Sequence, residues 1–82
     1  MTQNTHPSVS AMRSLIEQLR QSERSFTAKL ARRRAELDAA GHLHWTDPVH
    51  VRLTAMLRNI RGELSDAETS LQRRAATAAK LS

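Results

Sequence analysis

The chain has 82 residues, with 13 lysine and arginine residues against 8 acidic ones, which gives a formal net charge of +5 at pH 7. A chain this short forms one domain at most and buries only a modest core, so we do not expect an enzyme. It contains no cysteine, which excludes disulfide frameworks, thiolate zinc sites and thiol nucleophiles.

The N-terminal segment 1–7 is expected to be flexible. Residues 1–12 lack the basic start and hydrophobic block of a secretory signal. No apolar run along the chain approaches the roughly 20 residues that cross a bilayer. We therefore expect a cytoplasmic protein without a membrane span.

The first predicted element is a helix over residues 8–40. Pro7 and Ser8 supply its opening signal, and Gly41 follows it, where a left-handed C-terminal cap is expected. Residues spaced alternately three and four apart are mostly apolar, which is typical of a coiled-coil seam. This seam consists of Val9, Met12, Ile16, Leu19, Glu23, Phe26, Leu30, Arg33, Leu37 and Ala40.

The next element is a turn over residues 41–47. Asp47 and Pro48 provide an N-cap followed by proline at the first helical position. A hairpin end leaves the last core layer open, so we expect Trp45, with Leu43, to fold over it as a lid.

Three histidines, His42, His44 and His50, lie in and beside this turn. They are numerous enough for a zinc or copper site, but no cysteine accompanies them and Asp47 is better used as a cap. No nucleophile is evident beside them. We therefore expect solvated histidines, with no metal ligand, no catalytic residue and no cofactor.

The last element is a helix over residues 48–80, with a second seam. The seam consists of Leu53, Leu57, Ile60, Leu64, Ala67, Leu71, Arg74, Ala78 and Leu81. Two long helices joined by a short loop must lie antiparallel. The predicted fold is an all-α, coiled-coil-like antiparallel two-helix hairpin over residues 8–82, completed by dimerisation or by a helical partner.

A turn centred on Trp45 would make the facing seam residues apolar, as in Leu30 opposite Ile60. The flanking charges would then also match. The expected ion pairs are Lys29 with Glu63 and Arg20 with Glu68. Where Arg33 interrupts the seam, its guanidinium is expected to reach water. Where Glu23 interrupts it, the carboxylate either fixes the register or faces a basic residue of a partner.

The side of the second helix opposite its seam carries small residues. A glycine inside a helix costs about 1 kcal/mol relative to alanine, and small side chains allow another helix to approach closely. The alternative is that alanine is simply a good helix former in a biased chain. The candidate partner-binding residues are Val51, Ala55, Gly62, Ser65, Thr69 and Ala76.

The basic residues also suggest nucleic acid as a ligand. Arg13, Arg20 and Arg34 fall along one flank of the first helix. However, no aromatic platform for stacking bases is expected, because Phe26 belongs to the seam.

The stretch LARRRAELDAAGHL, followed by DP and an apolar-periodic helix, resembles the small helical-hairpin co-chaperones of bacterial type III secretion, the YscE/EscE/SsaE type. In that family an antiparallel hairpin pairs with a helical-repeat chaperone, and together they keep the needle subunit unpolymerised in the cytoplasm. The resemblance covers roughly Met12 to Ser65. This chain departs from the family pattern in its longer His/Trp turn and in its Ala-rich basic tail.

These observations predict a non-enzymatic adaptor or co-chaperone that docks onto a larger helical protein or associates with itself. Two alternatives stay open. One is a homodimeric four-helix bundle that binds nucleic acid, and the other is a His-rich metal-binding protein.

Overall fold

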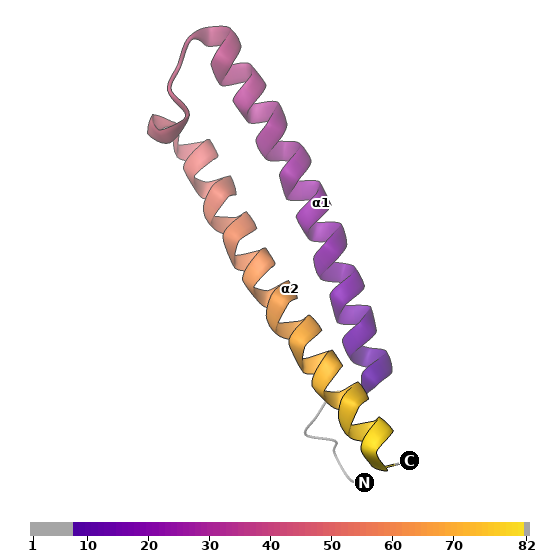
Figure 1. Ribbon diagram of the computed structural model, residues 1–82. Helices are drawn as coiled ribbons and strands as arrows, with labels where there is room; N and C mark the ends of the chain where they lie inside the picture. Colours follow the sequence, from indigo (N-terminus) through magenta and orange to yellow (C-terminus); the bar gives the residue numbers. More distant parts are fainter. Residues whose placement is uncertain (1–7, 82) are drawn as a thin grey trace, which may run out of the picture.

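The computed structural model describes residues 8–81, so the segment 1–7, expected to be flexible, lies outside the described residues. Two long helices, α1 (Val9–Ala40) and α2 (Pro48–Leu81), are joined through a short 3-10 helix, η1 (His44–Thr46). The long helices lie side by side and run in opposite directions (Figure 1). The predicted all-α two-helix hairpin is confirmed.

Both ends of α1 form as the sequence predicts. At the N-terminus, the Ser8 hydroxyl accepts a hydrogen bond from the Ala11 amide at 3.1 Å. At the C-terminus, Gly41 adopts φ 73°, a left-handed conformation that favours glycine because a Cβ would be strained. The His42 amide then donates to the Leu37 carbonyl at 2.9 Å.

The start of α2 is also as predicted. The Asp47 carboxylate accepts a hydrogen bond from the His50 amide at 2.8 Å, and Pro48 occupies the first helical position. Proline fits there because that amide has no partner inside the helix. The sequence predicted only a loop before α2, but the structure has a 3-10 turn there. The Asp47 amide donates a hydrogen bond to the His44 carbonyl at 3.1 Å and closes this turn.

The core is a single layer between two helices. Its buried apolar residues all belong to the predicted seams: Met12, Ile16, Leu30, Leu37 and Leu57. The molecule measures 16 Å across its thinnest dimension, little more than the roughly 10–12 Å diameter of one helix. Each helix therefore leaves most of its circumference exposed.

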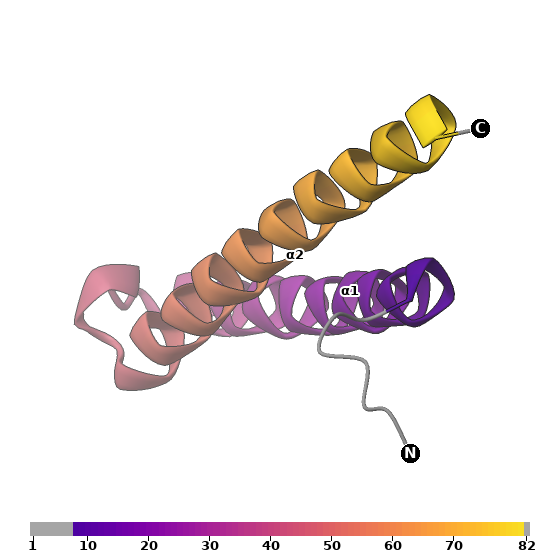
Figure 2. The ribbon, with the colours of Figure 1, turned by 90° about the horizontal axis from the view of Figure 1, so that it is seen from below.

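Figure 2 shows that the helices cross at an angle, so that the C-terminal end of α2 lies apart from α1. In agreement, every side chain from Ala75 to Lys80 is exposed. Within residues 8–81, neither helix has an apolar stretch long enough to cross a membrane.

The predicted register is displaced toward the turn. Arg20 pairs with Glu68 at 2.9 Å, as expected, but Glu23 accepts a hydrogen bond from Arg61 at 3.1 Å instead of lying opposite Ala67. At the turn end of the hairpin, His50, three residues before Leu53, is the first buried residue of α2. Glu23 thus pairs within the hairpin.

One predicted ion pair is absent from the described residues. Lys29 makes no ion pair with Glu63; its ammonium group lies 4.9 Å from the centre of the Phe26 ring. A cation over an aromatic face is attracted by the ring quadrupole. Phe26 is half-buried rather than enclosed.

Candidate interaction surface

An ion pair ties α1 to the start of α2. Arg33 donates from Nη2 to Asp47 Oδ1 at 2.6 Å and from Nε to Asp47 Oδ2 at 3.0 Å. The Asp47 side chain is only 11% exposed. Such a bidentate contact fixes geometry as well as charge. The Arg33 side chain is 31% exposed, so its guanidinium lies at the edge of the core, where Asp47 holds it.

The ionisation of Asp47 follows from its hydrogen bonds. The Arg33 side chain, and after it the His50 amide, lower the pKa of the Asp47 carboxyl from 3.8 to about 2. The hydrogen bond to Asp47 likewise raises the pKa of Arg33. The Asp47 carboxylate and the Arg33 guanidinium are therefore both ionised near neutral pH.

His50 is a core residue rather than a solvated one. It is 9% exposed, and its Nε2 accepts a hydrogen bond from Arg34 Nε at 3.0 Å. Because a guanidinium can only donate, Nε2 must be unprotonated. Burial, and then the charge of Arg34, lower the pKa of His50. The expectation of a solvated histidine was wrong here because Arg34 supplies the donor that lets imidazole enter the core.

The other two histidines do not complete a metal site. His44 Nε2 lies 2.7 Å from Asp38 Oδ1, and the His44 ring centre lies 5.1 Å from that of His50. His42 is exposed. Within residues 8–81, no three histidine or carboxylate residues are grouped so that they could hold a metal ion.

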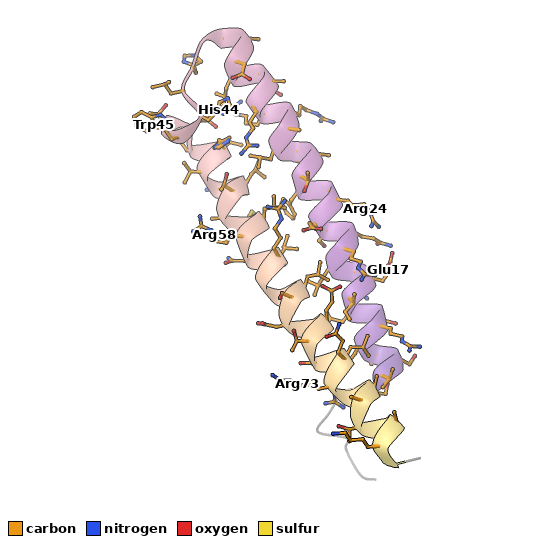
Figure 3. The ribbon with its side chains drawn as sticks, viewed as in Figure 1. Glu17, Arg24, His44, Trp45, Arg58 and Arg73 are labelled. Atoms are coloured by element: carbon orange, nitrogen blue, oxygen red, sulfur yellow. The ribbon has the colours of Figure 1, made fainter. Side chains whose placement is uncertain are left out.

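Trp45 does not form a lid. Its side chain is 73% exposed and that of Leu43 is also exposed. Figure 3 shows Trp45 on the outer side of η1, away from α1. The prediction failed because the 3-10 turn carries Trp45 outward, while His50 occupies the end of the core.

The exposed Trp45 adjoins the predicted partner-binding residues. Trp45, Val51 and Ala55 line a groove of about 290 Å³, hereafter the Trp45 groove, together with His50, Thr54 and Arg58. The other candidates are also exposed, further along α2: Gly62, Ser65, Thr69 and Ala76. A Cβ added at Gly62 would meet no atom within 4 Å. The structure therefore leaves room for a partner along this face.

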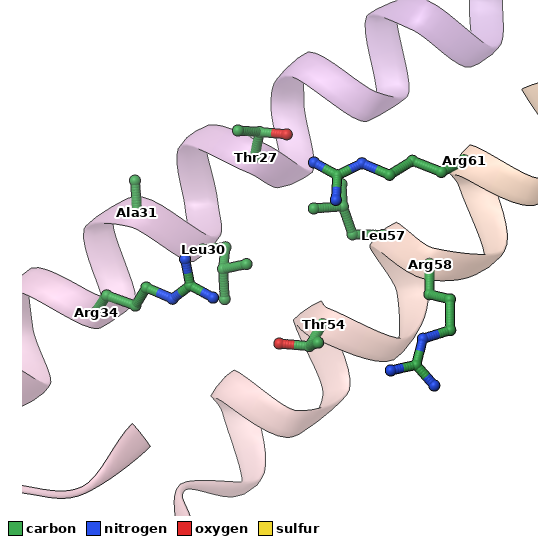
Figure 4. A pocket seen from close by; sticks show the side chains of 8 residues that line it. All are labelled: Thr27, Leu30, Ala31, Arg34, Thr54, Leu57, Arg58 and Arg61. Carbon is green, nitrogen blue, oxygen red and sulfur yellow. The ribbon is translucent and has the colours of Figure 1, made fainter. Parts of the chain in front are cut away.

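A second groove, hereafter the arginine groove, lies between the two helices. It has a volume of about 390 Å³, and Figure 4 shows its lining side chains. They are Thr27, Leu30, Ala31 and Arg34 of α1 with Thr54, Leu57, Arg58 and Arg61 of α2. Thr54 and Arg58 line both grooves, so the two form one surface.

The sequence interpretation missed the arginine groove. The available signal was the spacing of Arg58 and Arg61, which puts both on one side of α2 beside Leu57. Arg34 reaches the same groove from α1. No protein-family model, curated protein or solved structure matches the chain. The fold and surface define its class as an antiparallel helical hairpin with an aromatic and basic outer surface.

Proposed function

We propose that this protein is a non-enzymatic adaptor that binds another helical protein through the outer face of α2. The observation that carries this proposal is the exposure of Trp45 beside Val51 and Ala55. Tryptophan is normally buried to a large extent, and where it is not, it is enriched among the residues that dominate binding at interfaces.

The thinness of the core supports a partner. Only five apolar residues of the described part of the chain are buried, and every candidate residue on the outer face of α2 is exposed. A partner helix laid along α2 would add a second layer to the thin core.

A more specific form of the proposal is a cytoplasmic co-chaperone of type III secretion. It is supported by the hairpin fold and by the resemblance of the stretch from Met12 to Ser65 to the helical-hairpin co-chaperones. In this form, α2 docks onto a helical-repeat chaperone that holds the needle subunit.

The test is co-expression with the helical-repeat chaperone and the needle subunit encoded in the same genome. A stoichiometric complex is expected with wild type. Val51→Ser and Trp45→Ser should weaken it, whereas Val49→Ser should not, although Val49 and Val51 are similarly exposed, at 48% and 52%. Successive helical residues point to different sides, so this valine pair separates the proposed face from general hydrophobicity.

Two results would count against the proposal. If no complex forms, the type III secretion role is dropped. If Val49→Ser and Val51→Ser weaken a complex equally, the outer face of α2 is not the docking surface.

A second candidate is binding of nucleic acid, favoured by one observation. Trp45 is exposed beside Arg58, so an aromatic platform that was not expected from the sequence exists after all. Binding of a single-stranded oligonucleotide that quenches Trp45 fluorescence and falls steeply with salt would support this candidate.

A further inference from the structure

The arginine groove combines an apolar floor with a basic rim. Leu30 and Leu57 are buried at its floor. In Figure 4, the Arg34 and Arg61 side chains extend across the groove toward each other, and Arg58 lies at its outer edge. Each helix therefore contributes both apolar and cationic atoms to one concave surface.

The positive charge of this rim is only partly neutralised within the hairpin. Arg61 pairs with Glu23 at 3.1 Å. Arg34 donates to His50, which must be uncharged at Nε2 to accept. Arg58 has no hydrogen bond or ion pair with any residue in the described part of the chain. The rim thus retains positive charge that a ligand of opposite charge would meet.

We infer that the arginine groove binds an acidic amphipathic helix of the partner protein. This inference rests on the proposed adaptor function and names the chemistry of the docking segment. Carboxylates one turn apart on such a helix pair with Arg58 and Arg34, since guanidinium and carboxylate groups match in bidentate geometry. An apolar side chain on the same face covers Leu30 and Leu57.

The Trp45 groove extends this docking path. Because Thr54 and Arg58 line both grooves, a helix seated at Arg58 continues toward Val51 and Trp45. Its next apolar residue contacts the exposed indole there. The occupant is therefore apolar along one stripe and acidic beside it.

A second copy of the chain and nucleic acid both fit the arginine groove less well than an acidic amphipathic helix. A second copy docked symmetrically would bring the same basic rim against itself, in a chain of net charge +5. Nucleic acid would satisfy the arginines but leave the apolar floor without a complement. An acidic amphipathic helix satisfies both the floor and the rim.

The test uses a displayed library of random 16-residue peptides without tryptophan, selected on the full chain. Peptides retained by wild type but not by Arg58→Glu should be enriched in Glu and Asp, beside apolar residues spaced three and four apart. Retained peptides without this pattern, or no peptide that distinguishes the two proteins, would overturn the inference.

The selected peptide is then titrated by Trp45 fluorescence. Arg58→Glu should weaken its binding roughly tenfold or more, the loss expected when a charge-assisted hydrogen bond at an interface is removed. Arg52→Glu is the matched control, because it changes the net charge equally at an exposed position that does not line the groove. Equal weakening by both changes would mean non-specific attraction and would overturn the inference.

Two further measurements identify a different occupant. An oligonucleotide that binds more tightly than the peptide and loses affinity with Arg58→Glu but not Arg52→Glu would replace the helix with nucleic acid. Self-association abolished by Arg58→Glu would replace it with a second copy. If a native partner is lost with Val51→Ser but unaffected by Arg58→Glu, the adaptor function stands and the arginine groove does not bind the partner.

Discussion

Arg34 on α1 donates a hydrogen bond from Nε to Nε2 of His50 on α2, with 3.0 Å between the two nitrogens. This contact joins the two helices in the core layer nearest the turn. It also fixes the neutral state of His50, since a protonated Nε2 would offer Arg34 a second donor in place of an acceptor.

The hairpin should therefore lose stability as the pH falls below about 6.5. Burial lowers the pKa of His50 from its ordinary value of 6.5, so the unfolded chain takes up a proton that the folded chain resists. The charges facing His50 are Arg34 of α1, His44 of η1 and Asp47 at the cap, of which only Asp47 favours protonation. Thermal melting at pH 7.5 and pH 5.5, followed by circular dichroism, measures the loss.

His50→Leu should flatten this dependence, because leucine fills the core position without titrating. His42→Gln, at an exposed position, is the control and should melt as wild type does at both pH values. A wild-type protein whose melting temperature is the same at both pH values would show that His50 is not buried as a neutral group.

A second loss of stability is expected in stronger acid. The hydrogen bonds from Arg33 and from the His50 amide lower the pKa of Asp47 from 3.8 to about 2. The resulting stability is present above pH 3.8 and is lost as the pH falls toward 2. Asp47→Asn should remove this transition while keeping the helix cap, since asparagine caps as well as aspartate.

The ion pair between Arg33 and Asp47 can also be tested at neutral pH with a double-mutant cycle. Arg33→Gln and Asp47→Asn should each lower the melting temperature. The melting temperature of the double variant should fall by less than the sum of the two single decreases. Additive losses would mean that the bidentate pair does not couple the helices.

Gly62→Leu should have opposite effects on stability and on binding. Leucine is the better helix former by up to about 1 kcal/mol, and the open space at Gly62 accommodates it. A docked helix would be displaced at a cost of about 1–3 kcal/mol, roughly a five- to 150-fold loss of affinity. Melting and titration with the native partner measure the two effects.

Ala28→Leu on the exposed side of α1 is the control for Gly62→Leu and should leave binding unchanged. A partner that binds Gly62→Leu as tightly as wild type would show that this side of α2 stays in solvent.

Trp45→Ser should leave the fold intact and impair binding. Since Trp45 is exposed, its loss should change unfolding free energy by no more than about 0.5 kcal/mol. Leu30→Ala, at a buried position, should cost about 2–5 kcal/mol. Denaturant titration compares the two variants. If Trp45→Ser destabilised the protein as much as Leu30→Ala, Trp45 would have to cover the core as first predicted.

The sequence was sufficient for features that depend on a few neighbouring residues. The caps at Ser8, Gly41 and Asp47 each involve contacts within five positions, so residue type and spacing alone predict them. The two seams follow from helical periodicity in the same way. For this reason the antiparallel hairpin was predicted correctly, and the predicted helices 8–40 and 48–80 differ by one residue from Val9–Ala40 and Pro48–Leu81.

The tertiary structure alone decided what meets across the hairpin. Periodicity predicts which side of each helix is buried, but it leaves open which residues pair across the two helices. Arg20 pairs with Glu68 as expected, whereas Glu23 pairs with Arg61. His50 could enter the core only because Arg34 reaches it, and Trp45 turned outward once His50 occupied that end. The predicted small-residue face is therefore exposed, as its helical position requires, whereas the arginine groove exists because the register places residues of both helices around Leu30 and Leu57.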